Sequence, residues 1–160
     1  MFDIVKYPNR LLKKKCAAVA MVGDEERDTL RRMLKAMYLN KGIGLAAPQV
    51  GINKKLAVVD IGDKKVVRLI NPSITKLRGS EAMEEGCLSI PGAYVNVKRP
   101  SHITVESLDE NGRKIRFEAS GLSARAIMHE IDHLNGKLII DYVNPVQRFL
   151  KTRRSRKCQG

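Results

Sequence analysis

One five-residue segment constrains this chain more than any other: His129-Glu130-Ile131-Asp132-His133. It lies in a helical pattern that we expect to run from about Ser120 to Asn135, with Gly136 closing the helix. Two residues four apart on a helix lie on the same side, one turn apart, so both imidazoles can reach one metal ion. The glutamate between them lies next to that ion without having to bind it. The segment therefore predicts a helix that carries a site for metal-assisted hydrolysis.

The alternative is an exposed helix on which the two histidines fall at this spacing by chance. Apolar residues on more than one face of the helix favour a buried position instead. Two buried, unpaired imidazoles would be costly, and a metal ion would satisfy them. These apolar residues are Leu122, Ala126, Ile127, Ile131 and Leu134.

A hydrolytic metal site needs about three protein ligands and one open position. The helix supplies two, and the strongest candidate for the third is Cys87, which lies among glycine and turn residues in the segment 85–89. His102 begins an expected strand with no motif around it, so we interpret it as a surface histidine. Cys16 and Cys158 are interpreted as ordinary free thiols.

The composition indicates one globular domain. The chain has 160 residues, of which 43% are hydrophobic, so a packed core is expected without disulfides. An odd, sparse set of three cysteines is typical of a reducing compartment. The first residues do not resemble a signal peptide, and no apolar run is long enough to span a membrane. We therefore expect a cytoplasmic protein with no membrane partner.

The charge is concentrated near the C-terminus. Of the net charge of +13, the last 13 residues contribute six without an offsetting acid, so we divide the chain into a catalytic domain, residues 1–147, and a basic tail, residues 148–160. Such a charge favours polyanionic partners, and contact of the tail with the ribosome or RNA is one hypothesis. A disordered tail is the alternative. A purely nucleic-acid-binding protein is less well supported, because only 4% of residues are aromatic and no binding motif accompanies the charge.

The remaining pattern predicts an α+β fold with mainly antiparallel sheets packed around the metal-binding helix, an N-terminal helix and a C-terminal segment. The N-terminal helix is expected to begin with Asp24 as its N-cap and to end at Asn40. Residues 42–49 are interpreted as a loop, and Asn111-Gly112 as a hairpin turn. The expected strands are residues 55–61, 66–70 (ended by Asn71-Pro72), 74–77, 102–108 and 114–118.

Three segments, in this order, closely resemble the motifs of the peptide deformylase family. The resemblance covers about residues 1–147. The matching segments are Gly42-Ile43-Gly44-Leu45-Ala46-Ala47-Pro48-Gln49, Glu85-Gly86-Cys87-Leu88-Ser89 and His129-Glu130-Ile131-Asp132-His133.

The resemblance implies an enzyme that removes the formyl group from the N-terminal formyl-methionine of newly synthesised proteins, with formyl-methionyl nascent peptides as its partners. It implies one divalent metal ion, most typically Fe²⁺, with Ni²⁺, Co²⁺ or Zn²⁺ also able to bind, and a water in the fourth position. The ligand types alone would have suggested zinc.

The resemblance also assigns roles to residues of the site. Glu130 would act as general base and then general acid, and Gly44 would contact the substrate backbone. The side chain of Gln49 and the N–H of Leu88 would stabilise the oxyanion. We expect Glu85, paired with Arg99, to orient a ligating histidine. The implied metal ligands are Cys87, His129 and His133.

A formyl group is smaller than an acetyl group, so we expect Gly42 and Gly44 to keep the site narrow enough to exclude the latter. The methionine side chain needs an apolar slot. Ordinary core packing is an equal alternative for each residue assigned to that slot. The candidates are Ile43, Met83, Leu122 and Ala126.

Two other classes of function remain open at this point. A zinc endopeptidase also uses a His-Glu-x-x-His helix, but it would take its third ligand from a downstream Glu or His, and beyond His133 the only acid is Asp141. An inactive relative would keep the fold, although every motif position is intact.

Overall fold

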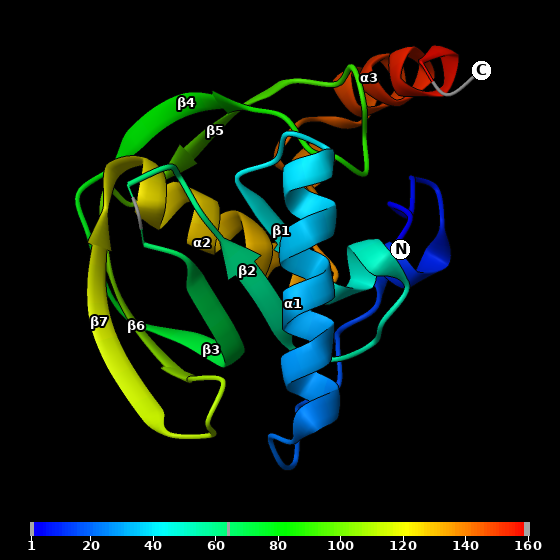
Figure 1. Cartoon of the computed structure of the whole chain (residues 1–160). Coiled ribbons are helices and arrows are strands. Elements are labelled where there is room, and N and C mark those ends of the chain that lie inside the picture. Colours follow the sequence, from blue (N-terminus) through cyan, green and yellow to red (C-terminus); the bar gives the residue numbers. More distant parts are fainter. Residues whose placement is uncertain (1, 64, 159–160) are drawn as a thin grey trace.

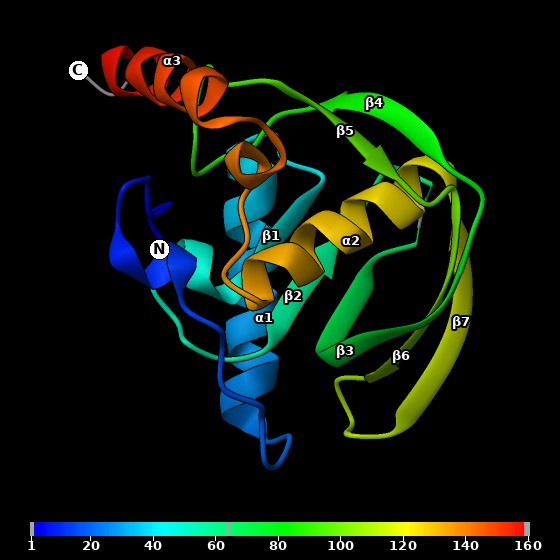
Figure 2. The same ribbon diagram turned by 180° about the vertical axis from the view of Figure 1, so that it is seen from behind.

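The structure is a computed structural model that describes residues 2–63 and 65–158. Figures 1 and 2 show it from opposite sides. The expected α+β class with antiparallel sheets is confirmed. In chain order the elements are η1 (Arg10–Lys13), α1 (Asp24–Leu39), β1 (Gly44–Ala46), η2 (Ala47–Val50), β2 (Leu56–Val59), β3 (Val67–Arg78), β4 (Glu81–Glu85), β5 (Val95–Arg99), β6 (His102–Leu108), β7 (Lys114–Ser120), α2 (Gly121–Leu134), η3 (Ile139–Tyr142) and α3 (Pro145–Lys157), where η denotes a 3₁₀ helix.

The strands form two antiparallel sheets. The larger has the order β1-β2-β3-β6-β7, and β4 pairs with β5 in the smaller. The hairpin expected around Asn111-Gly112 is confirmed: β6 and β7 pair from His102 opposite Ser120 to Leu108 opposite Lys114. Figure 2 shows α2 crossing the middle of the molecule, with β4 and β5 on one side and the larger sheet on the other.

The strand β2 lies between two helices. Its four residues are all buried, because successive side chains of a strand point to opposite faces. Leu56 and Val58 pack into the cluster that contains the buried face of α1. Ala57 and Val59 pack into the cluster that contains α2. The strand is thus packed between the N-terminal helix on one face and the helix that carries the metal-binding motif on the other.

The helix α2 forms where the periodicity predicts it. It runs from Gly121 to Leu134, and Gly136 follows with a φ of +73°, a conformation that glycine adopts without a steric penalty. Its residues Ala124 and Ile127 are fully buried in the cluster beneath the sheet. One face of α2 is therefore anchored in the apolar core.

The structure corrects the prediction that Asn71-Pro72 ends a strand. A single strand, β3, runs through both residues, and its pairing with β6 shifts register between Ile70 and Ser73. Asn71 adopts a φ of +51°, and its side-chain amide exchanges two hydrogen bonds of 2.8 Å with the backbone of Val19. A bulge of this kind accommodates a proline, which cannot donate to the ladder.

Three further boundaries differ from prediction. Within residues 42–49, which were expected to form a loop, β1 begins at Gly44 and η2 follows at Ala47. The strands β4 and β5 were also not among the expected strands. The first four residues of β4 are exposed and largely polar, without an apolar alternation, whereas β5 does alternate, with Val95 and Val97 buried. The helix α1 begins at Asp24 itself and Gly23 is its N-cap; the Glu26 side chain accepts the Gly23 N–H at 3.0 Å.

The described part of the predicted tail is helical rather than disordered. The helix α3 begins after Asn144, whose side chain caps the N–H of Gln147, and it lies at the edge of the molecule in Figure 1. Residues 159–160 of that tail lie outside the described residues. The division of the chain at residue 147 falls within α3 and stays a prediction. Among the described residues, no helix combines the length and apolarity that crossing a membrane requires.

Candidate metal-dependent active site

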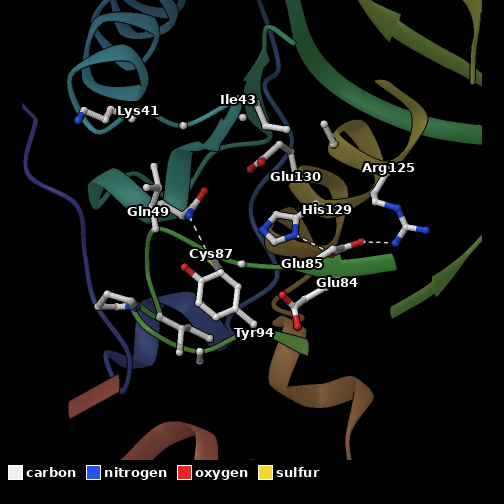
Figure 3. Close-up of a pocket in the computed structure, with 18 of the residues that line it drawn as sticks. Lys41, Ile43, Gln49, Glu84, Glu85, Cys87, Tyr94, Arg125, His129 and Glu130 are labelled. Carbon is white, nitrogen blue, oxygen red and sulfur yellow. Dashed lines mark hydrogen bonds and ion pairs between the residues drawn. The ribbon is translucent and has the colours of Figure 1, made fainter. Parts of the chain in front are cut away.

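The three sequence motifs meet around one end of a cavity (Figure 3). The helix α2 contributes His129, Glu130 and His133, the turn after β4 contributes Cys87, and η2 contributes Gln49. One potential ligand atom from Cys87 and from each histidine lies within 4.8 Å of the others. In the described part of the chain no other group of three such residues was found. His102, Cys16 and Cys158 lie outside this group, as the sequence suggested.

Cys87 has the character of a ligand. Burial by itself would raise the pKa of its thiol, but His133 and His129 beside it hold that pKa well below its usual range. The Sγ atom lies 3.3 Å from Nε2 of His133. A thiolate is therefore available at the place where two imidazoles converge.

The orientation of His129 is set by Glu85. The Nδ1 atom of His129 lies 3.0 Å from a Glu85 carboxylate oxygen, which leaves Nε2 for a metal ion. Burial would lower the pKa of His129, but its interactions with Cys87 and Glu85 raise it well above its usual value. A metal ion would displace the proton held in this cluster, as metal binding to thiolate and imidazole ligands generally does. One thiolate and two imidazoles suit a divalent transition metal.

Glu130 lies beside the three ligands and is almost completely buried. Burial raises the pKa of its carboxyl to about 7, against the opposite effect of His129 and His133. Its Oε2 atom has no hydrogen-bond partner among the described residues. A buried carboxyl oxygen without a partner is costly, so its position next to the ligand group points to a water or a substrate group as its natural partner.

Gly44 makes room for this carboxyl group. A Cβ atom on Gly44 would lie 2.3 Å from Oε1 of Glu130, closer than any side chain tolerates. A Cβ atom on Gly42 would lie 2.9 Å from a side-chain carbon of Leu88. A Cβ atom at either glycine would thus press on a side chain of another motif, and the overlap is more severe at Gly44.

The amide of Gln49 is held in one orientation. Its oxygen accepts the N–H of Ala46 at 2.9 Å, and its nitrogen donates to the hydroxyl of Ser89 at 3.2 Å. The same nitrogen lies 3.6 Å from Sγ of Cys87. A dashed line marks this contact in Figure 3. The N–H of Leu88 finds no acceptor among the described residues. Two neutral donors therefore lie near the ligand group.

The cavity has a volume of about 500 Å³, and all four residues predicted for the side-chain slot line it. Ordinary core packing does not describe Ile43, Met83 and Leu122, because 43%, 38% and 44% of their surfaces are exposed. Ala126 is buried and belongs to the core cluster as well. Their role in binding a substrate stays a prediction.

Glu85 is the centre of a buried network that the sequence revealed only in part. The expected pairing with Arg99 is present, at 2.6 Å and 2.9 Å. Arg125 also donates to Glu85, at 2.8 Å, and to the backbone carbonyls of Val97 and Glu81. Although burial acts to raise it, His129 and Arg99 lower the pKa of Glu85 to about 2.

Arg125 was missed by the sequence reasoning. The available signal was its position four residues before His129, which places both on the same face of the helix. A charged residue on a buried helix requires a partner, and Arg125 has one in Glu85.

Comparison with known proteins agrees with this geometry. A sequence model of the family described as polypeptide deformylase matches residues 1–149. A curated protein of Thermodesulfovibrio yellowstonii named peptide deformylase is 45% identical over 154 residues, which cover 94% of this chain and 93% of that protein. A solved peptide deformylase structure from Legionella pneumophila has a TM-score of 0.95 at 37% identity, covering 99% of this chain and 95% of the other. One from Synechococcus elongatus, in complex with actinonin, has a TM-score of 0.90 at 45% identity, covering 99% and 88%.

Proposed function

This chain belongs to the polypeptide deformylase family, and from that membership we propose how its residues perform the family's metal-dependent reaction. The reaction removes the formyl group from the N-terminal formyl-methionine of newly synthesised proteins. The observation that most supports the assignment is the unpartnered carboxyl oxygen of Glu130 beside the Cys87, His129 and His133 group.

The three ligand residues would hold one divalent cation. When bound, it would act as a Lewis acid that makes water nucleophilic near neutral pH and polarises the formyl oxygen. We propose Fe²⁺ as the native ion from the family resemblance. Metal analysis of protein purified without oxygen tests this identity, and stoichiometric zinc with full activity would contradict it.

Glu130 supplies the proton transfers. Its carboxylate accepts a proton from the attacking water and then gives that proton to the departing amine. A carboxyl group whose pKa is raised towards 7 by burial suits both steps, because it can hold and release a proton near neutral pH. Because Gly44 has no Cβ atom, there is room for the Glu130 side chain in this position.

Gln49 and Leu88 stabilise the negative charge that develops on the formyl oxygen. The amide nitrogen of Gln49 is already oriented by its bonds to Ala46 and Ser89, so little reorganisation is needed during the reaction. The free N–H of Leu88 provides a second donor. Removing one such donor from comparable sites costs about 3–4 kcal/mol.

We propose that the cavity selects formyl-methionine in two ways. The narrow region at Gly42 and Gly44 admits the hydrogen of a formyl group and excludes the methyl of an acetyl group. The methionine side chain occupies the apolar part of the cavity. The four residues that we assign to that slot all line the cavity: Ile43, Met83, Leu122 and Ala126.

The central experiment measures formate release from formyl-Met-Ala-Ser by anaerobically purified protein and by its Glu130→Gln variant. We expect turnover that a chelator abolishes and that the substitution lowers by about 10²–10⁴-fold, without loss of metal. An exposed carboxylate on β7 provides the matched control, Glu118→Gln.

No turnover with Fe²⁺, Ni²⁺ or Co²⁺ bound would contradict the proposed activity and favour an inactive relative. Cleavage of internal peptide bonds in blocked peptides would favour an endopeptidase instead.

We also propose that the enzyme works in the cytoplasm, where nascent chains emerge, and that α3 contacts the ribosome. The exposed cations of α3 support the contact: Arg153, Arg154, Arg156 and Lys157. Co-sedimentation with ribosomes at increasing salt would compare the protein with a variant in which all four are glutamine. Equal pelleting of the two would remove α3 from the proposal.

A further inference from the structure

The N-terminal segment crosses η2 and the turn after β4, the two segments that carry the oxyanion donors. The N–H of Val5 donates to the carbonyl of Gln49 at 2.8 Å. Two residues later, the N–H of Tyr7 donates to the carbonyl of Ser89 at 2.9 Å. The segment 5–7 therefore joins η2 to the turn after β4, two regions about 40 residues apart in sequence.

Between these two backbone contacts lies Lys6. Its ammonium group donates to the carbonyl of Leu88 at 2.6 Å, and the residue lines the cavity of the metal site. The hydrogen bond is charge-assisted and partly buried, which makes it stronger than one between neutral groups in water.

The turn at residues 87–89 is held at every carbonyl. Cys87 accepts the N–H of Ile90 at 3.0 Å, Leu88 accepts Lys6, and Ser89 accepts Tyr7. The bond from Lys6 is the only one of the three made by a side chain. It fixes the peptide plane directly after Leu88, so it limits rotation of the residue whose N–H is left free for the substrate.

We propose that Lys6 is a positioning residue: its ammonium group orients the turn so that the Leu88 N–H points at the reacting oxygen. The inference rests on the proposed role of Leu88 in the deformylation reaction. In this proposal Lys6 acts through the turn, by its hydrogen bond to the Leu88 carbonyl. Because the bonds of Val5 and Tyr7 come from the backbone, they remain when the Lys6 side chain is replaced.

The test is Lys6→Met, which keeps the length and the apolar stem of the side chain. With the metal loaded, we expect kcat to fall about tenfold while KM changes less than twofold, because a misplaced oxyanion donor weakens transition-state stabilisation alone. Lys6→Arg, which retains a donor, is expected to recover most of the lost kcat.

A second readout does not depend on turnover. In zinc-loaded protein labelled with ¹⁵N, the amide resonance of Leu88 is expected to shift in Lys6→Met and to return towards its original position in Lys6→Arg. The matched control is Lys35→Met on the exposed side of α1, which removes the same charge from a position outside the cavity lining.

The possible failures are distinguishable. No formate release by the wild-type protein would contradict the proposed function. An active wild type whose kcat and Leu88 resonance are unchanged in Lys6→Met would overturn the role of Lys6. A lower melting temperature in that variant with kcat unchanged would also overturn it, since it would show only a structural contact.

Discussion

The two faces of α2 are both buried, yet they have opposite chemistry. One face places Ala124 and Ile127 in the apolar cluster under the larger sheet. The other places Arg125 and His129 against the carboxylate of Glu85. Apolar burial stabilises the first face without directional requirements, whereas each charge on the second face needs a specific partner.

The thiol pKa values of Cys16, on the apolar side, and Cys87, on the polar side, differ in the same way. Cys16 lies in the apolar cluster, and burial raises the pKa of its thiol to about 11. Burial acts in the same direction on Cys87, but the neighbouring histidines reverse it and the pKa falls well below its usual range. Burial alone therefore does not decide the state of a thiol; the charges that accompany it do.

The largest expected effect is the loss of activity when the thiol of Cys87 is replaced by a hydroxyl. Cys87→Ser removes a thiolate ligand, so we expect weak metal binding and roughly a thousandfold loss of activity, the value of several kcal/mol of lost Lewis-acid catalysis. Metal analysis and formate release measure both quantities.

The matched variant is Cys16→Ser. It is expected to keep its metal and its activity and to lose about 1–3 kcal/mol of stability, because a hydroxyl replaces a thiol in an apolar site. Stoichiometric metal in Cys87→Ser would show that metal binding at the polar face does not depend on the Cys87 thiolate.

The second prediction concerns the space beside the polar face. In Gly44→Ala the new methyl group collides with the Glu130 carboxyl, and displacement of a catalytic group by about 1 Å costs about a hundredfold in rate. Steady-state kinetics measure the loss. Gly23→Ala is the control, since its methyl group would meet only a Glu26 oxygen at 3.6 Å, an ordinary contact. Equal activity of the two variants would mean that Glu130 has room to move.

The third prediction uses the pH dependence of stability to test the ionic contribution of the polar face. The pKa of Glu85 is about 2 in the folded protein and near 4.5 when unfolded. As the pH falls, the unfolded chain takes up the proton first, so the stabilisation is complete above about pH 4.5 and is lost as the pH falls towards 2.

Glu85→Gln is therefore expected to be less stable than the wild type by about 2 kcal/mol at pH 7, with the difference shrinking below pH 4.5. Denaturant unfolding at several pH values measures it. Glu118→Gln on the exposed face of β7 should show no such dependence, and a constant deficit in Glu85→Gln would contradict the ionic origin of the stabilisation.

The smallest effect is one of reactivity. In chelator-treated protein at pH 8, iodoacetamide is expected to modify Cys87 well before Cys16, because a thiol with a pKa of about 11 is only about 0.1% ionised. Mass spectrometry identifies the modified residue. Labelling of Cys16 at the rate of Cys87 would show that the apolar cluster opens readily.

Local patterns in the sequence were sufficient for much of this molecule. The spacing of His129 and His133, the glycine at position 136 and the alternation in β6 and β7 act over a few residues, and each produced the expected element. The bulge at Asn71 could not be predicted from local pattern, because its two side-chain hydrogen bonds go to Val19, 52 residues earlier.

What the sequence by itself determined was the fold class, the helix with its two potential ligands, and the two further motifs that contain Gln49 and Cys87. What only the tertiary structure decided was which partner each of these charged side chains meets: Arg125 reaches Glu85 across 40 residues, and Lys6 reaches the carbonyl of Leu88 across 82. The physical reason is the range of the forces involved. Backbone periodicity and turn preference are local, whereas the partner of a buried charge is chosen by how distant elements pack.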